Sequence, residues 1–121
     1  MDPREFIGLA RGLIDGTGEG DAPQSTLRTV VNRSYLGALL FSAQVLATYR
    51  GAAYARDGTY YHRVEEDLMD IDPGLRERLR SLRLWRVDAD YDLTRDLPWR
   101  MSTTALEQAD RLVREVRQKV L

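Results

Sequence analysis

The chain has no cysteine and only one histidine among its 121 residues. Without cysteine it cannot form disulfides, thiolate metal sites, iron–sulfur clusters or a thiol nucleophile. Because His62 is the single imidazole, a histidine-based metal centre is excluded too, and we expect no metal and no other cofactor. The lack of cysteine is compatible with a reducing cytoplasm, where we expect the protein to act.

A long apolar run and a strong net charge are missing as well. The least charged stretch, residues 34–49, is too short for a membrane span and carries Gln44, so we predict a buried central helix there and no contact with a membrane. Residues 1–14 are charged and periodic, unlike a signal peptide. The net charge of −1 gives no overall attraction for nucleic acid, so any such contact requires a local basic patch.

Apolar residues recur at helical spacing along most of the chain, and no convincing strand pattern interrupts them. This pattern predicts one all-α domain over residues 1–121, folded as a bundle of about five helices. The glycine-rich residues 16–23 are expected to be a linker, and the acidic residues 88–99 an irregular segment. The expected helices cover about residues 3–15, 25–49, 60–71, 73–87 and 102–120.

The same spacing assigns caps and faces to these helices. Asp72 followed by Pro73 predicts a capped start, as do Ser25 and the pair Thr104 and Glu107. The residues expected on buried stripes are Phe6, Leu9, Ala10 and Leu13 in the first helix, Leu75, Leu79 and Leu82 in the fourth, and Ala105, Ala109, Leu112, Val116 and Val120 in the last. The residues expected to face water are Glu65, Glu66 and Asp67 in the third helix and Arg76, Arg80 and Arg83 in the fourth.

Arg86 interrupts the apolar stripe of the fourth predicted helix, because it follows Leu82 by four residues and Leu75 by eleven. An unpaired buried charge costs about 3–5 kcal/mol, so this guanidinium needs a partner. The simpler interpretation is an ion pair with Asp90 at the i+4 position, with Asp88 nearby. The functional interpretation is an anion site at a helix end or dimer seam that receives phosphate. The residues alone favour the ion pair.

Three segments, in order along the chain, resemble small HEPN-domain proteins. Residues 32–43, NRSYLGALLFSA, resemble the family's R-A-Y-Y-A-A-F-H-A-A helix, and residues 61–64 resemble the start of its next helix. Residues 84–92, LWRVDADYD, resemble its L-R-N-x-A-D-Y-D segment. Residues 105–120 match the closing amphipathic helix, so the resemblance covers most of the chain. It implies a helical bundle that is commonly a homodimer.

The resemblance also implies a function. Many HEPN proteins are metal-independent ribonucleases of toxin–antitoxin or defence systems, and others are paired with a small nucleotidyltransferase. It therefore implies a homodimer with RNA or a small nucleotidyltransferase as its partner. Active members carry an arginine followed a few residues later by a histidine, because RNA cleavage needs proton transfer near neutral pH and a fixed cation on the phosphate. Arg86 matches that arginine.

Tyr91 stands where the family has the histidine, and Leu40 replaces a second histidine that is frequent in the family. A phenol with a pKa of about 10 is a poor base at neutral pH, and loss of general acid–base catalysis costs about 10²–10⁴ in rate. On a straight helix Tyr91 also lies about 140° around the axis from Arg86. We therefore predict an RNA- or partner-binding module with weakened catalysis; the alternative is an active metal-independent endoribonuclease.

His62 begins a different predicted helix and is the only histidine that could replace the missing one; Tyr91 and Asp88 are the other candidates for its role. It would have to converge with Arg86 in the folded bundle; capping or packing beside Tyr60 and Tyr61 is the simpler interpretation. The acidic residues that follow His62 are interpreted as a solvated helix face rather than a metal site. The candidate catalytic residues are Arg86, Tyr91, Asp88 and His62, and the candidate ligand-binding residues are Arg33, Asp90 and Arg83.

Overall fold

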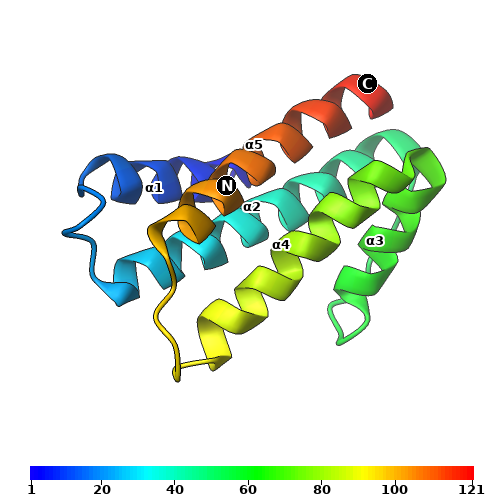
Figure 1. Cartoon of the computed structure of the whole chain (residues 1–121). Helices are drawn as coiled ribbons and strands as arrows, with labels where there is room; N and C mark the ends of the chain where they lie inside the picture. The colour runs from blue at the N-terminus through cyan, green and yellow to red at the C-terminus, as the bar shows by residue number, and fades with distance from the viewer.

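The computed structural model describes all 121 residues and consists of five α-helices without a strand (Figure 1). The expected all-α bundle is confirmed. No helix in it is both long enough and apolar enough to cross a membrane. The helices are α1 (Arg4–Asp15), α2 (Gln24–Arg50), α3 (Tyr60–Ile71), α4 (Pro73–Tyr91) and α5 (Trp99–Val120).

The central helix is α2, which contacts the other four. Its buried side chains include adjacent residues, for example Val30 and Val31 or Val45 and Leu46, which point about 100° apart around the helix axis. A helix that is apolar around most of its circumference has to be covered from several sides. In Figure 1, α5 runs beside α2 in the same direction, while α1 and α4 run in the opposite direction.

The helix boundaries differ from expectation mainly in the acidic segment. Helix α4 continues to Tyr91 instead of stopping near residue 87, and α5 begins at Trp99 directly after the extended residue Pro98. The Thr104–Glu107 pair therefore lies inside α5 and is not a cap. The expected cap at Asp72 is confirmed, because its carboxylate accepts a hydrogen bond of 2.8 Å from the backbone N–H of Gly74.

Two polar side chains of α2 hold the end of α4 and the loop after it. Arg28 donates hydrogen bonds to the carbonyl oxygens of Ala89 (2.8 Å), Asp92 (2.9 Å) and Arg95 (2.7 Å). Gln24 binds the backbone of Leu97 through both of its amide atoms, at 2.7 and 3.0 Å. A cation at the carbonyl end of a helix stabilises it. These contacts explain why α4 extends further than its sequence pattern indicates.

The buried face of α1 was predicted only in part, because Ala10 is buried as expected but Leu9 is not. Ile7, Ala10 and Ile14 are buried, whereas Leu9 is 54% exposed. Both sets of residues have helical spacing, so the periodicity alone does not choose between them. The choice is made by Gly37 of α2, because a Cβ there would lie 2.6 Å from Cγ1 of Ile7. The missing side chain lets Ile7 pack directly on the α2 backbone.

The expected stripes of α4 and α5 are confirmed more closely. Leu75, Leu79 and Leu82 are fully buried, as are four of the five residues expected on the face of α5. The exception is Val120, which is partly exposed at the end of its helix. These side chains join those of α1 and α2 in one continuous core.

We predict opposite effects of alanine at Gly37 and at Gly12. A Cβ at Gly37 meets Ile7 and also the carbonyl oxygen of Pro3 at 3.1 Å, so Gly37→Ala should lower the free energy of unfolding by about 1–3 kcal/mol. At Gly12 of α1 a Cβ meets nothing within 4 Å. Gly12→Ala should therefore raise stability by about 0.5–1 kcal/mol through helix propensity. Urea unfolding followed by circular dichroism measures both; equal stability of the two variants would contradict this packing.

Candidate functional site

Arg86 lies on the side of α4 that faces α2. Its Nε is 2.8 Å from Oδ2 of Asp90, but its N–H does not point at that oxygen, so the contact is an ion pair and not a hydrogen bond. Its guanidinium carbon lies 6.0 Å from the centre of the Tyr35 ring of α2. The ion pair that the sequence favoured over a phosphate site is therefore present. Both charged side chains remain partly accessible to solvent.

Asp90 is also held from α2, because Asn32 donates a hydrogen bond of 3.2 Å to its Oδ2. Tyr35, beside Arg86, is buried, and this burial is the main cause that raises the pKa of its phenol to about 12; the Glu65 carboxylate adds to the effect. A phenol with that pKa is neutral at physiological pH. Tyr35 therefore cannot supply a base beside Arg86.

Arg83, a candidate ligand residue, is engaged by α3. Its Nε donates a hydrogen bond to Oε2 of Glu65 at 2.8 Å, and its Nη2 donates one to Oε1 at 3.3 Å. Its guanidinium carbon also lies 5.1 Å from the centre of the Tyr61 ring. The hydrogen bond to Glu65 is the main cause that raises the pKa of Arg83.

The expectation that Glu65 and Arg83 face water was wrong. Their side chains are only 5% and 19% exposed. Each residue lies on the polar side of its own helix when that helix is considered alone. The packing of α3 against α4 turns these two polar sides toward each other, and the two charges then neutralise each other in the contact.

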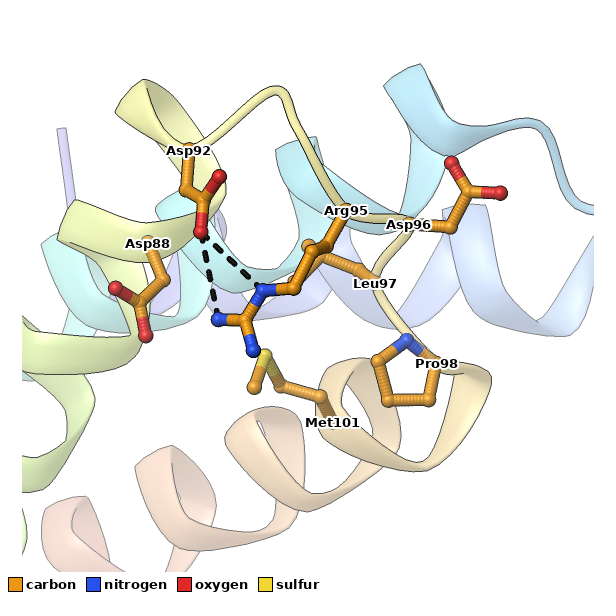
Figure 2. A pocket seen from close by; sticks show the side chains of 7 residues that line it. All are labelled: Asp88, Asp92, Arg95, Asp96, Leu97, Pro98 and Met101. Carbon is orange, nitrogen blue, oxygen red and sulfur yellow. Dashed lines mark hydrogen bonds and ion pairs between the residues drawn. The ribbon is translucent and has the colours of Figure 1, made fainter.

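Tyr91 and Asp88 do not converge with the Arg86 guanidinium. Tyr91 is the last residue of α4 and is 72% exposed. Asp88 is exposed and lines a surface hollow of about 240 Å³ between the end of α4 and the start of α5 (Figure 2). The remaining residues that line the hollow are Asp92, Arg95, Asp96, Leu97, Pro98 and Met101.

The hollow in Figure 2 is acidic but is not arranged as a metal site. Its carboxylates point in different directions, and Arg95 forms an ion pair with Asp92 at 3.3 Å. Hydrogen bonds from Thr94 are the main cause that lowers the pKa of Asp92. This carboxylate therefore stabilises the turn that follows α4. Nowhere in the chain do three histidine or carboxylate side chains gather as a group that could hold a metal ion.

His62 and Arg33 also lie apart from the Arg86 contacts. His62 is exposed near the start of α3, with its ring 4.2 Å from that of Tyr61, which is the packing that the simpler interpretation predicted. No hydrogen bond or ion pair joins it to Arg86. Arg33 faces α1, where its guanidinium carbon lies 5.7 Å from the centre of the Phe6 ring and its buried Nε has no hydrogen-bond partner. The candidate residues therefore do not form one catalytic cluster within a single chain.

One surface feature was missed in the sequence. Leu84, Val87 and Tyr91 are 45%, 40% and 72% exposed and lie on one face of α4, at spacings of three and four residues. We call these three residues the α4 stripe. Leu93, just beyond the helix, is also exposed. The signal was available, because the helix has a second apolar periodicity beside the buried leucines, but the charged residues between them obscured it.

In comparisons with known proteins, no family model, no curated protein and no solved structure matches this chain. The resemblance to HEPN proteins therefore depends on the quoted residues and stays a prediction.

We predict strong coupling between Glu65 and Arg83. Glu65→Leu should lower the free energy of unfolding by about 3 kcal/mol, because it leaves the Arg83 charge without its partner in a largely buried contact. The double variant Glu65→Leu/Arg83→Met should recover most of that loss, since two apolar side chains can replace a buried pair. A double-mutant cycle by urea unfolding measures the coupling. Additive effects of the two single changes would show that the pair contributes no interaction energy.

Proposed function

We propose that this chain is an HEPN-type helical module of a toxin–antitoxin or defence-like system, which works as a homodimer and acts by binding rather than by cutting RNA. The observation that carries this proposal is the α4 stripe, an exposed apolar face on the same helix as Arg86. RNA or a small nucleotidyltransferase is the partner that the dimer would bind.

The α4 stripe supports a protein contact because its apolar residues are grouped. Single exposed apolar side chains are normal on a protein surface and need no explanation. Leu84, Val87 and Tyr91 instead share one helix face that no other element of the chain covers. A grouped apolar face of this kind is typical of a surface that is buried in an assembly.

Charges beside the α4 stripe favour a second copy of the chain as the occupant. Arg80 precedes Leu84 by four residues and Asp88 follows it by four, so both lie near the same helix face. If two α4 helices pack antiparallel around Leu84, Arg80 of each copy lies beside Asp88 of the other. A twofold interface requires self-complementarity of this kind. No ion pair within the chain engages Asp88, and Arg80 has only a long contact of 3.9 Å with Glu77.

Weakened catalysis is supported by the surroundings of Arg86. Its charge is already balanced by Asp90, and the residue at the histidine position, Tyr91, is exposed at the end of the helix. The only histidine, His62, lies on α3 and packs on Tyr61 of that same helix, away from Arg86. Phosphate binding by Arg86 would have to displace Asp90, which opposes the ribonuclease alternative.

We predict that reversing the charges of Arg80 and Asp88 together restores the dimerisation that each single reversal weakens. Arg80→Asp and Asp88→Arg should each weaken dimerisation at least about tenfold, because like charges then meet across the twofold axis. The variant with both changes should dimerise like the wild type. Analytical ultracentrifugation measures the dimer dissociation constant, with Arg63→Asp, an exposed change of the same charge on α3, as the control.

A wild type that stays monomeric at high concentration would refute the homodimer. Failure of the double reversal to restore dimerisation would place the interface elsewhere. Leu84→Glu gives an independent check, since it should disrupt the same contact at its centre without touching the buried core.

We predict no RNA cleavage above background by the wild type. Labelled RNA is incubated with purified protein in chelator, in parallel with Arg86→Ala and Tyr91→His. Wild type and Arg86→Ala should give the same background, because Arg86 is paired and no histidine lies beside it. Cleavage by the wild type that Arg86→Ala abolishes would establish the ribonuclease alternative. Cleavage by Tyr91→His alone would still agree with a site that has lost its base.

A further inference from the structure

Helix α1 covers only part of the surface that α2 and α5 form together. The first residue of α1, Arg4, places its guanidinium carbon 5.7 Å from the ring centre of Phe41. From there α2 continues to Arg50 and α5 continues beside it to Val120 (Figure 1). Helices α3 and α4 pack against other sides of this part, but no helix continues α1 along the side on which α1 lies. A helix of 12 residues spans about 18 Å, whereas one of 27 residues spans about 40 Å, so α1 is too short to cover the rest.

The uncovered part contains two adjoining hollows, which share Arg117 and Leu121 as lining residues. We call them together the basic groove. Its floor includes the buried side chains of Phe41 and Val45, and beside them Tyr49 is 57% exposed. An apolar floor with an exposed aromatic residue is suited to contact with apolar side chains of a partner.

The rim of the basic groove carries three guanidinium groups, from Arg4, Arg114 and Arg117. Arg4 is paired with Asp2 at 2.6 Å, but no ion pair within the chain engages Arg114 or Arg117. No aspartate or glutamate lines either hollow, although acidic residues slightly outnumber basic ones in the whole chain. The groove is therefore a local concentration of positive charge that calls for an acidic partner.

The fold itself contains an example of what this surface accepts. Helix α1 is amphipathic, and it packs Ile7, Ala10 and Ile14 onto the earlier half of α2 and against α5. At its edge Arg11 forms an ion pair with Asp110 of α5. One turn further along α5, Arg114 takes the place of Asp110, so the sign of the charge is reversed. A helix in the uncovered half would therefore need acidic residues where α1 has arginine.

We propose that the basic groove binds an acidic amphipathic helix of a partner protein, with aliphatic residues on one face and glutamate or aspartate along its edges. The hollow against α2 has a volume of only about 270 Å³ and is open, which suits side chains inserted by a helix better than an enclosed small molecule. The aliphatic part of the floor favours a peptide over RNA, whose bases would use only the aromatic contact. The groove lies on the half of α2 away from the α4 stripe, so this inference does not depend on the proposed function.

The test uses two fluorescein-labelled helical peptides with the same leucine face, one edged with glutamate and the other with lysine. A labelled oligouridylate serves as the nucleic-acid probe. Binding to the whole chain is measured by fluorescence anisotropy for the wild type, for Arg114→Glu/Arg117→Glu, and for Arg63→Glu/Arg100→Glu as a control of equal charge at exposed positions. Circular dichroism confirms that each variant is folded.

We expect the glutamate peptide to bind the wild type and the control equally. It should bind Arg114→Glu/Arg117→Glu at least about tenfold more weakly, because two attractive contacts become repulsive. The lysine peptide should show the reverse preference, for the groove variant over the wild type. Tyr49→Ala should weaken binding of the glutamate peptide, but the variant should still prefer the glutamate peptide over the lysine peptide.

Three results would overturn the inference. Equal binding of the two peptides to the wild type would remove the charge argument, and equal loss in the control would show a nonspecific effect of net charge. Binding of the oligouridylate alone, lost in the groove variant, would assign the groove to nucleic acid. Dimerisation of Arg114→Glu/Arg117→Glu is expected to match the wild type, so failure of this inference is separable from failure of the homodimer.

Discussion

The need to cover α2 determines most of this structure. Its buried residues face in almost every direction, so α1, α4 and α5 each have to pack against a different side of it. Gly37 allows α1 to approach closely, and Arg28 holds the end of α4 in place by binding its last carbonyl groups. Burial of apolar surface supplies the driving force for this arrangement. Because α1 is short, it does not cover the later half of α2 or the adjoining part of α5 beyond Arg4. The open groove lies there.

The charges between the helices follow from the same packing. Helix α4 meets α2 and α3 with a surface that contains arginine as well as leucine, and those arginines find acidic partners where they are covered. Such pairs contribute little net stability, but removal of one partner is costly. The pair of Arg83 with Glu65 joins α4 to α3 and therefore favours one orientation of α4 over others. Arg86 is part of this arrangement. Its pairing with Asp90 explains its position in an apolar stripe without any ligand, and a role for it in phosphate binding has to compete with that pair.

Local patterns in the sequence predicted what depends on one helix at a time. The five helices, the cap at Asp72, the buried leucines of α4 and the pair of Arg86 with Asp90 four residues later all follow from helical periodicity. What depends on a second helix was not predicted. The pairing of Glu65 with Arg83, the choice of Ile7 over Leu9 and the extension of α4 by Arg28 each require contacts between residues far apart in the chain. Periodicity shows that a helix has an apolar side, but not which neighbour will cover its polar one.

The two open surfaces lie along different halves of α2, and this separation has a consequence for assembly. Arg86 of α4 lies near Tyr35, while the basic groove begins at Phe41 and continues toward the end of the helix. Pairing of two chains through the α4 stripe would therefore leave both grooves uncovered. A twofold dimer would then present two identical basic grooves in a fixed geometry. A partner with two acidic helices could engage both, and the second contact would form at the high effective concentration set by the linker between them. In such an assembly dimerisation would increase affinity for the partner without adding any contact to either groove.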